Sequence, residues 1–168
     1  MTNQFEQVAL RAARAAGRIH LKRLSNIHID RKSSSIDLVT EADREAEAAA
    51  IDVVHRAFPT HAILAEESGL SAHESDHRWI IDPLDGTTNF AHGFPMFCVS
   101  IAYQRRGRTQ FAIVYDALKK ECFVAERGRG ARLNGKRLRV STTVTLSSSL
   151  LATGFPYDRR ERRRFYLT

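Results

Sequence analysis

The most informative part of this sequence is Trp79-Ile80-Ile81-Asp82-Pro83-Leu84-Asp85-Gly86-Thr87-Thr88-Asn89-Phe90. Its first three residues are apolar and predict a short strand that ends at Asp82. Pro83 and Gly86 then favour a tight turn, which swings Asp85 back beside Asp82. Two carboxylates held together repel each other unless a cation lies between them, and oxygen ligands of this kind suit Mg²⁺. The stretch therefore indicates a metal site, although taken alone Asp-Pro-x-Asp-Gly is equally typical of a surface turn.

A second acidic pair, Glu66-Glu67, also follows a short apolar run, at 63–65. If the two predicted strands are neighbours, Glu66 and Asp82 meet at one edge of the sheet. A third acidic group, Asp43, lies in the first turn of a predicted helix. Taken singly, Glu66-Glu67 is a pair of solvated charges and Asp43 a helix-capping residue. The placement of both acidic groups at strand ends nevertheless favours a metal site.

The amides of Gly86, Thr87 and Thr88 follow the acidic turn directly. If a short helix begins there, its free N–H groups form a site for a phosphate group. His92 lies just beyond, and a surface position is favoured for it over contact with a substrate. Cys98 and Cys122 lie in strand-like runs and are interpreted as small core residues rather than reactive thiols.

Two amphipathic helices are predicted ahead of the strands. Apolar residues recur at helical spacing over 3–23 and from Thr40 onward, with Asn3 and Thr40 as N-caps, and Pro59 ends the second helix. Because the apolar runs that follow are closely spaced, without intervening helices, we expect an antiparallel sheet and an α+β, layered architecture. A further short helix is predicted at 159–168. The predicted strands cover 62–65, 79–81, 99–103, 111–115, 122–125 and 150–153.

The positive charge is concentrated late in the chain. The 168 residues carry a net charge of +7, and residues 127–168 hold 11 Lys or Arg against 2 Asp or Glu. This segment is either a solvated face or a contact surface for nucleic acid or an acidic partner. No apolar stretch is long enough to span a membrane and no secretory signal is visible. With only two cysteines, we expect a cytoplasmic protein.

Three ordered motifs resemble the inositol monophosphatase family, close to its bacterial inositol-1-monophosphatases. They are Asp37-Leu38-Val39-Thr40-Glu41-Ala42-Asp43, Glu66-Glu67-Ser68 and Asp82-Pro83-Leu84-Asp85-Gly86-Thr87-Thr88-Asn89-Phe90. Smaller matches include Lys32-Ser33-Ser34, Gly128-Arg129-Gly130-Ala131 and Gly154-Phe155-Pro156. The resemblance covers essentially all 168 residues in order.

The resemblance implies a Mg²⁺-dependent, lithium-sensitive phosphatase with a layered αβαβα fold, which acts on inositol monophosphate as a homodimer. It assigns a first Mg²⁺ to Glu66, Asp82 and the Leu84 carbonyl, and a second to Asp82 and Asp85. Glu66 and Thr87, with Asp43 bonded to Thr87, would orient and deprotonate the attacking water. The stretch from Asp85 through Gly86 and Thr87 to Thr88 would bind phosphate, and Lys32 would lie near the metals.

One motif of the family is not found in this sequence. The later segment of family members carries Trp-Asp-x-Ala-Ala-Gly, whose Asp completes the second metal site. The single Trp of this sequence is Trp79, which lies in no such motif. We therefore expect residues 1–168 to form one incomplete domain, in which the C-terminal α/β part is missing.

Two other functions stay open from the sequence. Relatives with these motifs cleave 3′-phosphoadenosine 5′-phosphate, fructose 1,6-bisphosphate or histidinol phosphate, so a sibling sugar or nucleotide phosphatase is one. Some bacterial relatives are partners of the transcription machinery, so a non-catalytic contact with RNA or RNA polymerase is the other. The arginines at 159, 160 and 162–164 motivate it.

Overall fold

The computed structural model describes residues 4–24, 41–70 and 74–153. The chain divides into two compact units, residues 1–138 and residues 139–168, and each is considered by itself. Several predictions from the sequence lie outside the described residues: Lys32, the caps Asn3 and Thr40, and the helix at 159–168.

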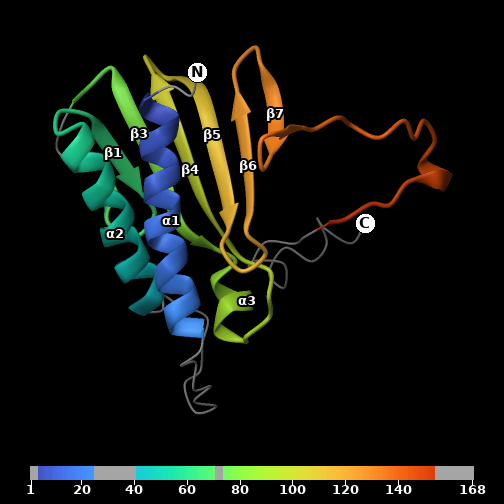
Figure 1. The fold of residues 1–168 in the computed structure, drawn as a ribbon, viewed down its shortest axis with the longest axis horizontal. Coiled ribbons are helices and arrows are strands. Elements are labelled where there is room, and N and C mark those ends of the chain that lie inside the picture. Colours follow the sequence, from blue (N-terminus) through green and yellow to red (C-terminus); the bar gives the residue numbers. More distant parts are fainter. Residues whose placement is uncertain (1–3, 25–40, 71–73, 154–168) are drawn as a thin grey trace, which may run out of the picture. The chain divides into compact units, whose positions relative to one another are not determined.

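Two helices cover one face of the sheet in the first unit (Figure 1). They are α1, Gln4–Leu24, and α2, Glu41–Ala57, and both lie close to their predicted positions. Alanine dominates their buried surfaces, because small side chains let two helices pack closely. Fully buried alanines line α1 at 9, 12, 13 and 16 and α2 at 46 and 50.

The sheet has eight strands in the order β2-β1-β3-β4-β5-β6-β7-β8. Every neighbouring pair is antiparallel except β1 and β3, which run parallel. The prediction of an antiparallel sheet is therefore wrong at one pair: β2 reverses the chain at the edge, so β3 returns beside β1 in the same direction. The strands are β1 Ala62–Ala65, β2 Gly69–Leu70, β3 His77–Asp85, β4 Cys98–Arg105, β5 Arg108–Asp116, β6 Glu121–Glu126, β7 Gly130–Leu133 and β8 Lys136–Arg137.

The main core lies between the helices and the sheet. Alternate residues of β3, β4 and β5, such as Trp79, Ile101 and Ile113, are fully buried beneath the helices. A smaller cluster of Ala42, Leu84, Phe90 and Phe97 lies around α3, Thr87–Ala91. This second cluster supports the loop that carries the candidate site.

Residues 139–153 of the second unit contain one short 3₁₀ turn, Leu146–Ser148, and no strand. The predicted strand at 150–153 is therefore wrong. An apolar run becomes a strand only when a neighbour accepts its backbone hydrogen bonds, and no described strand pairs with this one. None of the described helices is long and apolar enough to cross a lipid bilayer.

Candidate active site

The parallel pairing of β1 with β3 brings the first two acidic groups together. Ala65 is opposite Ile81, and the Glu66 amide donates a 3.1 Å hydrogen bond to the Ile81 carbonyl. Glu66, directly after β1, and Asp82, within β3, therefore lie side by side at the same end of the parallel pair, and the Glu66 carboxyl group is close enough to raise the pKa of Asp82. The hypothesis that these residues meet at one sheet edge is confirmed.

The Asp82 carboxyl group is electrostatically disfavoured in its charged form. Burial, followed by the charge and contact of Glu66 and the charge of Asp85, raises the pKa of Asp82 to about 7. Between about pH 4 and 7, Asp82 therefore keeps its proton in the folded state but has lost it in the unfolded state. The contribution of Asp82 to stability falls as pH rises through this range. A bound cation at this position removes the repulsion that holds the proton there.

The chemistry of these acidic residues fits Mg²⁺, because every donor is an oxygen and the negative charges of the two nearest carboxylates repel each other. Within residues 4–24, 41–70 and 74–153, however, no three His, Cys, Asp or Glu side chains converge into a ready-made metal cluster. The Asp85 carboxylate lies apart from the pair and accepts a contact from Cys98 Sγ at 3.8 Å. The described residues thus supply a close pair of carboxylates and a third one nearby.

A β-bulge, rather than the predicted tight turn after Asp82, connects the two aspartates. Asp82 is opposite Ser100 while Asp85 is opposite Cys98, so three steps on β3 match two on β4. Proline suits a bulge because it has no N–H to donate to the ladder. Asp82 Oδ1 accepts a 3.1 Å hydrogen bond from the Leu84 amide, so the side chain of Asp82 stabilises the bulge.

Thr87 begins α3 and links the bulge to α2. Its hydroxyl lies 3.1 Å from Asp43 Oδ1 and 3.0 Å from the Leu84 carbonyl, so one proton serves two acceptors. Asp43 is only 1% exposed, and packing therefore fixes its side chain. Gly86, just before the helix, has φ of 96°. The predicted short helix after the acidic turn is confirmed, as is the exposure of His92.

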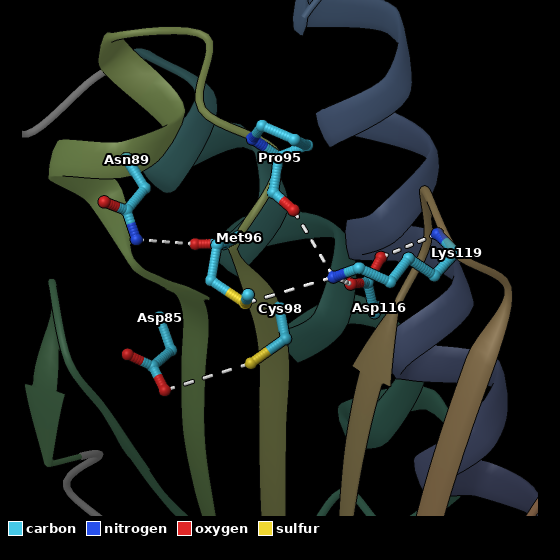
Figure 2. A network of polar contacts seen from close by, with 7 residues as sticks. All are labelled: Asp85, Asn89, Pro95, Met96, Cys98, Asp116 and Lys119. Atoms are coloured by element: carbon cyan, nitrogen blue, oxygen red, sulfur yellow. Dashed lines mark hydrogen bonds and ion pairs between the residues drawn. The ribbon is translucent and has the colours of Figure 1, made fainter. Parts of the chain in front are cut away.

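Polar contacts fasten the loop between α3 and β4 beside the site (Figure 2). Asn89 Nδ2 donates to the Met96 carbonyl at 2.8 Å. Lys119 Nζ reaches the Pro95 carbonyl at 3.3 Å and forms a 2.7 Å ion pair with Asp116. These bonds hold the loop at Pro95 and Met96, just before β4, so the backbone leading to Cys98, opposite Asp85, has a defined position.

Cys98 is half-buried at the start of β4, next to Asp85. Burial, and then the charges of Asp85, Asp82 and Asp116, raise the pKa of Cys98 to about 11. The side chain is therefore a neutral thiol at physiological pH, which agrees with its interpretation as unreactive. Cys122 packs against the main core, as predicted.

His20 is a site-supporting residue that the sequence analysis missed. It is fully buried on α1 between Phe90 and Phe97, and its Nε2 donates a 2.9 Å bond to the Pro83 carbonyl in the bulge. Burial lowers the pKa of His20, against the opposing effects of the Pro83 carbonyl and of Asp43 and Asp116. A histidine on the alanine stripe, four residues after Ala16, is the signal that could have identified it.

We expect His20 to make stability depend on pH. Because its folded pKa lies below the ordinary value of 6.5, its contribution is present above pH 6.5 and is lost as pH falls below it. For one titrating group, the free energy of unfolding changes by at most about 1.4 kcal/mol per pH unit. Urea unfolding of the parent and of His20→Gln from pH 7.5 to 5.5 measures this. The difference between the two proteins isolates His20 from Asp82, whose effect has the opposite sign; a difference independent of pH contradicts the assignment.

Comparisons with known proteins agree with this geometry. The model of the inositol monophosphatase family matches residues 1–167. The Nus factor SuhB of Pseudomonas aeruginosa is 50% identical over 156 residues, which are 89% of this chain and 57% of that protein. The inositol monophosphatase structure from Anabaena has a TM-score of 0.79 and 44% identity, over 94% of this chain and 57% of that one.

A more distant solved relative is SaIMPase-II. With inositol monophosphate bound it has a TM-score of 0.69 and 26% identity, over 86% of this chain and 52% of that one. It has also been solved with 2′-AMP bound. This chain thus spans little more than half the length of the relatives it matches. By family model, sequence and fold together, it belongs to the inositol monophosphatase family.

Proposed function

We propose that this chain forms the metal-binding part of a Mg²⁺-dependent phosphomonoesterase that hydrolyses inositol monophosphate to inositol and phosphate. The observation that carries the proposal is the register of the parallel strands β1 and β3, which places the Glu66 and Asp82 carboxyl groups side by side, so that the charge of Glu66 raises the pKa of Asp82. Such a pair is stable at neutral pH only with a proton or a cation between its members. Membership of a phosphatase family supports the cation.

The proposed ligands of a first Mg²⁺ are Glu66, Asp82 and the Leu84 carbonyl, and those of a second are Asp82 and Asp85. When bound, Mg²⁺ neutralises charge on the phosphate group and makes water a nucleophile at neutral pH. The Leu84 carbonyl already accepts the Thr87 hydroxyl at 3.0 Å, so its oxygen is held toward the site. Lys32 is proposed to lie near the metals but is outside the described residues.

The remaining steps belong to the chain's own side chains. Glu66 and Thr87 orient the attacking water, and Glu66 takes its proton as the water oxygen bonds to phosphorus. The P–O bond to inositol breaks in the same displacement, and the leaving inositol oxygen takes up a proton from solvent water. Asp43 holds the Thr87 hydroxyl from the buried face of α2. The backbone amides from Asp85 through Gly86 and Thr87 to Thr88 are proposed to hold the phosphate oxygens, so that the phosphorus faces the water.

A substrate panel tests the proposal. Phosphate release is measured with Mg²⁺ and with EDTA on inositol monophosphate, 2′-AMP, 3′-phosphoadenosine 5′-phosphate, fructose 1,6-bisphosphate and histidinol phosphate. We expect Mg²⁺-dependent release that is fastest from inositol monophosphate. Faster release from a nucleotide or another sugar phosphate would assign a sibling activity, and release that EDTA leaves unchanged would contradict a metal-dependent enzyme.

A second candidate function is binding to RNA as a partner of the transcription machinery. The Pseudomonas relative is named a Nus factor, and this chain has a groove of about 580 Å³ between α1 and α2 with four arginines. Arg56 pairs with Asp52 at 2.8 Å, whereas Arg11, Arg14 and Arg18 form no ion pair with any residue the structure describes. Guanidinium groups that share one groove favour phosphate groups.

Replacing Arg11, Arg14 and Arg18 together by Gln is expected to lower the affinity for RNA and to make that affinity less dependent on salt concentration. If each contacts one phosphate, the slope of log affinity against log salt becomes less negative by about 2. Fluorescence anisotropy with a labelled single-stranded RNA over a salt series measures the slope. The comparison variant carries Gln at 162–164; if that variant alone changes the slope, the contact belongs to the C-terminal arginines.

A further inference from the structure

A buried carboxylate on α2 holds the segment that follows β1. Glu47 is only 5% exposed. Its Oε2 accepts a 2.9 Å hydrogen bond from the Glu67 amide, and its Oε1 accepts a 3.0 Å bond from the Ser68 amide. Burying a charge is costly unless hydrogen bonds compensate it, and here each oxygen binds one of two successive N–H groups. The Glu47 carboxylate therefore fixes the backbone of Glu67 and Ser68 specifically.

The stretch that Glu47 holds carries the candidate metal ligand Glu66. β1 has only four residues and ends at Ala65, directly before Glu66. The backbone of Glu66 itself is tied to β3 by the bond from its amide to the Ile81 carbonyl. The direction in which the Glu66 side chain leaves the sheet therefore depends on where the next two amides are fixed.

The same face of α2 also holds the other half of the site. Asp43 lies one helical turn before Glu47 and bonds to Thr87, while Glu47 bonds to Glu67 and Ser68. Four helical residues span roughly 6 Å along the axis, and a helix packed in the core does not change that spacing. Helix α2 thus sets the distance between the Thr87 loop and the end of β1.

Glu47 also adds negative charge where acidic groups already gather. Asp43 lies one turn before it on α2, and Glu66 and Glu67 lie on the segment that it holds. A neutral side chain could satisfy part of the same hydrogen-bonding demand without this repulsion. A charged one is favourable when a cation occupies the neighbouring site, because the cation then offsets the crowding.

We propose that Glu47 is a positioning residue for the cation site, which fixes the Glu67–Ser68 backbone so that the Glu66 carboxylate faces Asp82. The inference rests on the proposed function, since it assigns this role to the same Mg²⁺ site. Glu47→Gln keeps the size of the side chain but turns one acceptor into a donor that faces an amide N–H. Glu47→Asp keeps the charge but shortens the reach to both amides.

Calorimetric titration of the whole chain with Mg²⁺ tests the role. We expect Glu47→Gln and Glu47→Asp each to weaken Mg²⁺ binding about tenfold or more, as is typical when a group that orients a ligand is lost. Amide hydrogen exchange at Glu67 and Ser68 is expected to accelerate in both variants. Asp52→Asn, which removes an exposed charge from the same helix, is expected to bind Mg²⁺ like the parent.

Val54→Ala is the control for stability alone, because Val54 is fully buried on α2 away from these contacts. If it weakens Mg²⁺ binding as much as the Glu47 variants do, Glu47 is merely structural and the inference is overturned. Parent-like affinity in Glu47→Asp but not in Glu47→Gln would mean that only the charge matters, which also overturns it. If Mg²⁺ binding depends on Asp82 but neither Glu47 variant changes it, the role of Glu47 is overturned and the proposed function stands. If the parent does not bind Mg²⁺, both are overturned.

Discussion

Replacing Asp82 by Asn is expected to lower the affinity for Mg²⁺ by at least about a hundredfold and to reduce phosphate release to a similar extent. Losing a group that only orients a metal ligand already costs about 10–100-fold, and Asp82 is proposed as a ligand of both ions. The neutral amide removes the charge that attracts the cation. Its carbonyl oxygen still accepts the bond from the Leu84 amide, so the bulge is retained.

The stability of Asp82→Asn separates loss of metal from loss of fold. Because the pKa of Asp82 is raised to about 7, its ionisation destabilises the folded state above that pH. Without Mg²⁺ at pH 8, the variant is therefore expected to be at least as stable as the parent toward urea. Calorimetric titration with Mg²⁺ is the primary measurement because it requires no substrate pocket. Equal Mg²⁺ affinity in Asp82→Asn and the parent would exclude Asp82 as a ligand.

Replacing Gly86 by Ala is expected to lower the free energy of unfolding by about 2–4 kcal/mol. Gly86 has φ of 96°, and a Cβ there would lie 2.8 Å from the Met96 carbonyl oxygen. The neighbouring backbone cannot yield easily, because the Asn89 side chain binds that same carbonyl. The substitution therefore displaces the turn between the acidic bulge and α3, and Mg²⁺-dependent activity is expected to fall with it.

Gly107→Ala is the matched control for the conformational part of this effect. Gly107 has φ of 71° in the turn between β4 and β5, but a Cβ there meets nothing within 4 Å. Its cost is expected to be the left-handed strain alone, about 1–2 kcal/mol. Urea unfolding of both variants measures the difference. Equal losses would show that the contact with the Met96 carbonyl contributes nothing.

The local elements of this fold are predictable from the sequence because their signals are short-range. Alanines at helical spacing mark both helices, and Pro59 follows the end of α2. The β1 prediction coincides with the observed Ala62–Ala65, whereas β3 extends to Asp85 through a bulge that contains Pro83. The short strands β2, β7 and β8 are not predicted, since two to four residues carry too little pattern to distinguish a strand from a turn.

The acidic residues and their order along the chain are a property of the sequence alone, and so are the motifs that indicate a phosphatase family. Whether Glu66 and Asp82 meet was decided by tertiary structure. Had β1 and β3 paired antiparallel, as expected for the sheet as a whole, the two carboxylates would lie at opposite ends of the strands. The same holds for His20 and Glu47, whose local spacing suggests only helix packing. Their partners Pro83, Glu67 and Ser68 are distant in sequence. Periodicity reports which face of an element is buried, whereas a site depends on which remote backbone lies against that face.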